Sequence, residues 1–132
     1  MFLNQLAVAE KEAFIELACS VSQCDGVVCD EEKQMLDSYL HEMNMEGSGY
    51  VIRQLPIEEI LDIFQNERTK NIVFIEILAL VFADGKFDEK EIEVLDKIKQ
   101  HFGISQEKYI NFKEWVKSVN NLYAEGYKLV NE

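Results

Sequence analysis

Hydrophobic residues recur every three or four positions through most of the chain, which is the spacing of one face of an α-helix. The stretches "AFIELACSV", "DEEKQMLDSYLHEM" and "DEKEIEVLDKIKQHF" show this pattern clearly. The longest apolar run, "IVFIEILALVFA", contains a Glu and is shorter than the roughly 17–25 apolar residues that a membrane-spanning helix needs. We therefore expect an all-α protein with no transmembrane segment, in which this run forms a buried core helix.

Glycine, proline and serine mark the expected helix boundaries. The "EGSG" segment at 46–49 interrupts the chain, and Pro56 fits the first turn of a short helix, "PIEEILDIFQ". Gly103 is expected to cap the helix before it, and Ser105 to open the final helix. That helix carries apolar and aromatic residues at helical spacing, which we expect to face the core: Tyr109, Phe112, Trp115, Val116 and Val119.

The chain repeats itself at a distance of 59 residues. This shift places the Asp-Gly pair at 25–26 on the pair at 84–85, and Glu32 on Glu91. Upstream, "FIEL" at 14–17 and "FIEI" at 74–77 correspond with a slip of one residue. The sequence thus predicts one domain over 1–132, a compact bundle of two pseudo-repeated helical hairpins (about 9–45 and 68–104). A linker with a short helix (about 46–66) joins them, and a C-terminal helix (about 105–130) follows.

Acidic residues around the two Asp-Gly turns are candidate metal ligands. Each copy reads D-G-x-[aliphatic or Phe]-x-x-x-E, and carboxylate oxygens suit a hard cation. The match to a calcium-binding loop is partial, because in the second copy its first and third positions are apolar. A divalent cation (Ca, Mg, Mn or Zn) would therefore need carboxylates from both loops: Asp25, Glu32, Asp84 and Glu91.

The same carboxylates also have a structural interpretation. Asp88, with Glu91 three residues later, resembles a capping box, and Asp25 and Asp84 can accept hydrogen bonds from backbone amides of the turns. These roles and a metal site do not exclude each other. Asp88 is thus a capping residue or a supporting member of the acidic cluster.

Glu76 stands alone in the middle of the apolar run, so we expect it to be at least partly buried. A buried carboxylate needs a partner or a raised pKa. Glu76 either supports the acidic cluster or pairs with a Lys, Arg or Tyr.

The formal charge of −12 is unevenly distributed. Residues 1–50 carry ten acids and two bases, residues 51–104 eleven and seven, and residues 105–132 four of each. An acidic chain is repelled by phosphate backbones and anionic lipids, which argues against nucleic acid as a partner. Cations or a basic protein surface fit better, and the charge also keeps the fold soluble. Since no signal peptide is evident, we expect a cytoplasmic protein.

The remaining reactive side chains do not form a catalytic constellation. Cys19, Cys24 and Cys29 are spaced by five, which suits buried reduced thiols better than a zinc site. His41 and His101 fit exposed helices, and neither a phosphate loop nor a nucleophile elbow is present. We therefore expect no enzyme activity.

The paired motifs "CDGVVCDEE" and "ADGKFDEKE", each between an apolar and an amphipathic helix, resemble the TerB-like domains of tellurite resistance. The same type of domain is similar to the N-terminal region of a membrane-anchored DnaJ-like co-chaperone. The resemblance implies a compact all-α fold, a stress-response role and a metal-binding acidic cluster at Asp25, Glu32, Asp84 and Glu91. The first copy departs from the pattern at Cys24 and Cys29. The expected function is a non-enzymatic cation-binding domain in a stress-response assembly; the alternative is an acidic interaction module that docks on a basic partner.

Overall fold

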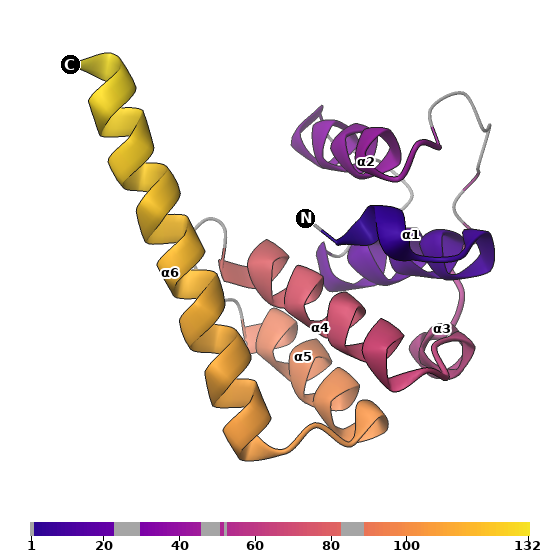
Figure 1. The fold of residues 1–132 in the computed structure, drawn as a ribbon. Coiled ribbons are helices and arrows are strands. Elements are labelled where there is room, and N and C mark those ends of the chain that lie inside the picture. Colours follow the sequence, from indigo (N-terminus) through magenta and orange to yellow (C-terminus); the bar gives the residue numbers. More distant parts are fainter. Residues whose placement is uncertain (1, 23–29, 46–50, 52, 83–88) are drawn as a thin grey trace.

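The computed structural model describes residues 2–22, 30–45, 51, 53–82 and 89–132, and every regular element in these ranges is helical. A short 3-10 helix and six α-helices follow one another along the chain (Figure 1): η1 (Leu3–Gln5), α1 (Val8–Ser22), α2 (Asp30–Glu42), α3 (Ile57–Ile63), α4 (Glu67–Phe82), α5 (Glu89–Phe102) and α6 (Gln106–Asn131). The helices pack against one another, so the predicted all-α bundle is confirmed.

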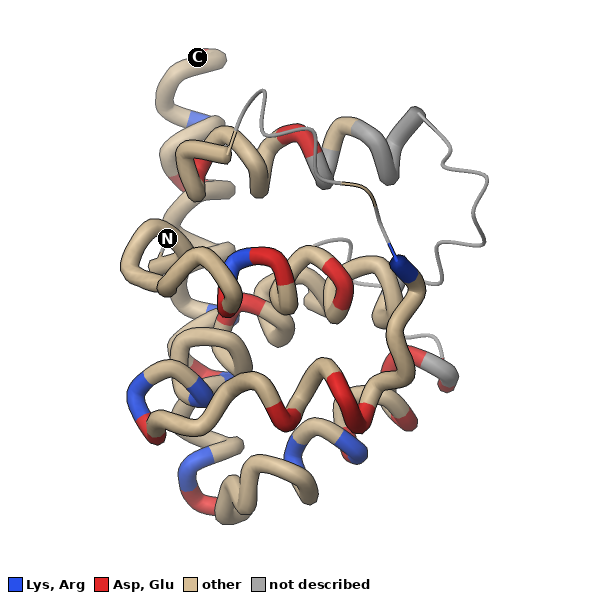
Figure 2. The backbone as a smooth tube through the Cα atoms, turned by 90° about the vertical axis from the view of Figure 1, so that its right-hand side faces the viewer, with Lys and Arg blue, Asp and Glu red and all other residues tan. Residues whose placement is uncertain are grey.

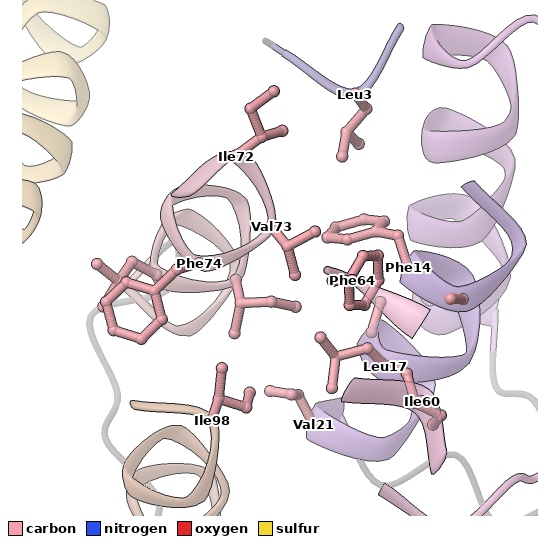
Figure 3. Close-up of a cluster of buried hydrophobic side chains, with 14 of the residues drawn as sticks. Leu3, Phe14, Leu17, Val21, Ile60, Phe64, Ile72, Val73, Phe74 and Ile98 are labelled. Atoms are coloured by element: carbon pink, nitrogen blue, oxygen red, sulfur yellow. The ribbon is translucent and has the colours of Figure 1, made fainter. Parts of the chain in front are cut away.

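Two central helices, α1 and α4, provide most of the core. Residues 13–19 of α1 are all buried, and α4 is buried over most of its second half, as predicted for the apolar run. Helices that are apolar on nearly every side need neighbours all round. Accordingly, α1 packs against α2, α3, α4 and α5, while α4 packs against η1, α1, α5 and α6. Figure 3 shows Phe14 and Leu17 of α1 facing Val73 of α4, with Ile98 of α5 nearby.

The second and fifth helices end in the same way. Asn44 and Gly103 follow them in the left-handed conformation, with φ of 57° and 67°. In both cases the amide of the next residue donates to the carbonyl five residues earlier, at 2.8 Å and 3.0 Å, which is a Schellman motif. The predicted cap at Gly103 is confirmed. Asn44 lies 59 positions before it and is the residue type that tolerates this conformation best after glycine.

The helix starts agree with the spacing of the predicted repeat. Val8 and Glu67 begin α1 and α4, and Asp30 and Glu89 begin α2 and α5, each pair 59 residues apart. The packing is less symmetric, because α5 contacts α1 whereas η1 lies between α2 and α4 and contacts both. The three-dimensional equivalence of the two hairpins stays a prediction.

The last helix is the longest of the described helices, with 26 residues. Its predicted start is confirmed, since the Ser105 hydroxyl accepts a hydrogen bond from the Lys108 amide at 3.1 Å. The first half packs on α4, where the Phe74 ring lies 6.1 Å from Tyr109 and 6.0 Å from Phe112 between centroids. The second half extends beyond the other helices toward the C-terminus (Figure 1).

We expect Gly103→Ala to lower the free energy of unfolding by about 1 kcal/mol, because a Cβ is strained at this positive φ. A Cβ at this position would meet no atom within 4 Å, so the loss would come from the backbone alone. Urea denaturation followed by circular dichroism measures it. Asn44→Gly is the matched control and should leave stability unchanged or slightly raised; equal midpoints for all three proteins would contradict the prediction.

Candidate functional site

Glu76 lies in the middle of α4 and is 4% exposed. Its Oε1 atom accepts a hydrogen bond from the backbone amide of Phe2 at 2.8 Å. The Phe2 ring in turn lies 6.0 Å from the ring of Trp115 on α6. The sequence predicted a Lys, Arg or Tyr partner for Glu76, and Tyr39 lies close enough to be affected by its charge. Burial raises the pKa of the Tyr39 hydroxyl, and the charges of Glu76 and Glu42 raise it further. Glu76 thus anchors the N-terminal segment to α4.

Glu16 is the corresponding residue of α1 and is even less exposed, at 1%. Its carboxylate accepts hydrogen bonds from the amides of Arg53 at 2.8 Å and Leu55 at 3.3 Å. Between them, Gln54 adopts a φ of 54°, and such a left-handed residue lets flanking amides turn toward one anion. Sequence reasoning missed Glu16. The available signal was the match of "FIEL" with "FIEI", which places the two glutamates at equivalent positions.

The predicted metal ligands fall mostly outside the described residues. Asp25, Asp84 and Asp88 lie there, and so does the side chain of Glu32. Glu32 and Glu91 are the third residues of α2 and α5, as expected, and Glu91 is half-buried. Over the described part of the chain, no group of three or more His, Cys, Asp or Glu side chains is arranged to hold a metal. The site assembled from both loops stays a prediction.

The outward half of α6 carries an exposed apolar surface, which we call the α6 stripe. It forms a shallow groove of about 510 Å³ lined by Val119, Leu122, Tyr123, Gly126, Tyr127 and Val130. Four of these residues, Leu122, Tyr123, Tyr127 and Val130, are largely open to solvent, from 61% exposed for Tyr123 to 81% for Val130. None of the lining residues is charged, so the groove offers apolar contact and two phenolic hydroxyls.

The sequence expectation for α6 was only partly right. Val116 is buried, and Tyr109, Phe112 and Val119 are half-buried, but Trp115 is 40% exposed. The apolar spacing continues past Val119, and this continuation was the missed signal. Sequence periodicity alone assigns such a face to the core, because it does not tell where the body of the protein ends.

The histidines and Cys19 lie where the sequence predicted them. His41 and His101 are exposed, and Nε2 of His101 lies 2.8 Å from Oδ1 of Asp62, which joins α5 to α3 at the surface. Cys19 is buried. Cys24 and Cys29 lie outside the described residues. These groups therefore add no reactive centre to the described surface.

Comparison with known proteins gives no relative from which to assign a function. No family model, no curated protein and no solved structure matches the chain. The resemblance to TerB-like domains therefore rests on the motifs alone. Among the described helices, none is both long and apolar enough to cross a bilayer.

We expect Glu16→Ala and Glu76→Ala each to lower the free energy of unfolding by about 1–3 kcal/mol, because each removes a buried carboxylate that accepts from a partly buried backbone amide. Glu93→Ala, at an exposed position of α5, is the control and should change stability by less than about 0.5 kcal/mol. Chemical denaturation of the three variants measures this. Equal losses at all three positions would show that the buried acceptors do not matter.

Proposed function

We propose that the protein is an interaction module rather than an enzyme, and that its binding surface is the α6 stripe. The observation that carries this proposal is a contiguous apolar groove on a chain with a net charge of −12. Exposed apolar patches of this kind mark interaction sites in soluble proteins. The groove runs along a helix, and its residues recur at three and four positions. The partner chemistry that fits it is the apolar face of another helix.

The acidic surface is a less specific alternative. Asp and Glu residues are spread along several helices of the body, as the red segments of the backbone in Figure 2 show. Docking of a basic partner on them would weaken steeply with added salt. Binding through the α6 stripe should change little with salt, because no charged side chain lines the groove. Salt dependence therefore separates the two modes.

Divalent-cation binding, in the manner of a TerB-like domain within a stress-response assembly, is a second candidate. It is supported by the shared placement of Glu32 and Glu91, each the third residue of the helix that follows an Asp-Gly motif. A carboxylate in a first helical turn is also favoured by the helix dipole, so this placement serves capping as well. Only a metal titration separates the two roles.

Photo-crosslinking tests the interaction surface. A photoreactive phenylalanine replaces Tyr127 in the groove or, as control, Glu114, which is exposed on the same helix and lies outside the groove. In the cells that naturally make the protein, we expect a discrete adduct from position 127 and none from position 114, unchanged in high salt. Mass spectrometry identifies the adduct. No adduct at 127, or equal adducts at both positions, would contradict the proposal.

An NMR titration with Ca²⁺, Mg²⁺, Mn²⁺ and Zn²⁺ tests the second candidate. If the cluster binds a cation, amide shifts should concentrate at residues 25, 26, 84 and 85, because carboxylates of both loops close on the ion. The double variant Glu32→Gln, Glu91→Gln keeps the side-chain shape and should abolish them. Absence of shifts at millimolar metal, or identical shifts in the double variant, would leave capping as the role of these residues.

A further inference from the structure

The α6 stripe continues the face by which the same helix packs on the body. Tyr109 and Phe112 contact Phe74 of α4, Val116 is buried, and the series goes on at Val119, Tyr123, Gly126 and Val130 with spacings of three and four. This is the spacing of a coiled-coil seam, in which an apolar stripe of period 3.5 packs on another helix. Half of the seam on α6 is already covered by a helix. The other half has the same geometry and lies open.

We propose that the open half pairs antiparallel with the same half of α6 in a second copy of the chain, forming a two-fold symmetric dimer. This inference rests on the proposed function, since it names the partner of the same surface. An isologous interface requires a self-complementary patch. A register that sets Tyr123 against Gly126 of the second copy also sets Val119 against Val130, so each tyrosine meets a glycine and each valine meets a valine along the seam.

The distribution of charge favours a second copy and fixes the direction of pairing. Residues 105–132 carry four acids and four bases, whereas residues 1–104 carry the whole net charge of −12. In the antiparallel register the two acidic bodies lie at opposite ends, with Phe112 and its counterpart about 38 Å apart along the axis. This separation is several times the screening length of about 10 Å in 0.1 M salt, so the two acidic bodies repel each other little. Parallel pairing would place both bodies side by side.

The positions that flank the seam do not oppose self-association. Asn120, Leu122, Tyr127 and Leu129 occupy them in the outward half, where coiled coils commonly carry charged residues that set partner choice. Two identical helices therefore meet there without like-charge repulsion. The salt-insensitive binding expected of the α6 stripe follows from the same composition.

Gly126 has no explanation within a single copy. It has helical backbone, where glycine costs about 1 kcal/mol relative to alanine. A Cβ at this position would meet no atom within 4 Å, so no contact inside the chain requires its absence. In the proposed dimer the missing side chain leaves room for the Tyr123 ring of the second copy, which lets the two helix axes approach closely.

The exposed area fits a weak, reversible pair. A covered aromatic side chain buries about 150–250 Å², and the outward half offers Tyr123 and Tyr127. Leu122, Leu129 and Val130 are 65–81% exposed and add to this area. Because Tyr123 and Tyr127 are only 61% and 67% exposed, the total stays below the ~800 Å² per partner of a standard protein interface, which predicts a weak and concentration-dependent dimer.

Sedimentation velocity from micromolar to millimolar concentration tests the dimer. We expect the wild-type chain to pass from one to two copies of 15.3 kDa as concentration rises. Tyr123→Asp buries a charge in the seam and should weaken association by about 100-fold. Asn121→Asp adds the same charge to an exposed position on the opposite face of α6 and should dimerise like the wild type. A thermal midpoint measured in dilute solution checks that both variants fold.

Disulfide formation tests the direction of pairing. Tyr123→Cys and Gly126→Cys chains, mixed and mildly oxidised, should link to each other faster than either links to itself, and the wild type is the control for the native thiols. Faster self-linking of each variant would indicate parallel pairing and overturn the register.

A monomer at every concentration in the sedimentation experiment overturns the second copy as partner. If the chain is monomeric, a photo-adduct between position 127 and a different protein would still support the proposed interaction surface. If no adduct forms either, both the dimer and the interaction surface are contradicted.

Discussion

Two carboxylates buried in the centre of the bundle constrain the paths of the segments around it. Moving a charged carboxylate out of water costs several kcal/mol unless donors replace the lost hydration. Glu16 and Glu76 stand in helices whose own amides are already bonded within the helix, so their partners have to come from outside it. The amides of Arg53 and Leu55 serve Glu16, and that of Phe2 serves Glu76. The linker before α3 and the N-terminal segment are held by these contacts.

The position of α6 follows from the same anchor. Because Glu76 holds Phe2 against α4, the Phe2 ring reaches Trp115 on α6, while Phe74 contacts Tyr109 and Phe112 from the other side of the seam. The first half of α6 is therefore clamped by aromatic contacts. The second half continues in a straight line from this clamp, past the end of the body. The groove is thus exposed because the aromatic contacts that hold α6 against the other helices involve only its first half.

Periodicity and local capping rules were enough to predict the helices. "IVFIEILALVFA" needs burial on all sides, and Gly103 and Ser105 end and begin helices for reasons that lie within a few residues. Burial of Glu16 was not foreseen, because its acceptor role depends on amides almost 40 residues away. The α6 stripe was missed for a related reason: an apolar face looks the same in sequence whether α4 covers it or nothing does. The metal site would depend on side chains of two separate loops, a long-range proximity that spacing alone does not give.

Helix length connects the core to the binding surface. α6 has 26 residues and α4, its main support, has 16, so α6 is longer by ten residues, or about 15 Å. A helical segment this short is marginal in water without tertiary packing, and a mid-helix glycine weakens it further. Its apolar residues would also lower its solubility if they stayed exposed. Covering the seam with a second helix resolves both difficulties, because it supplies the packing that the body cannot reach and removes the groove from water.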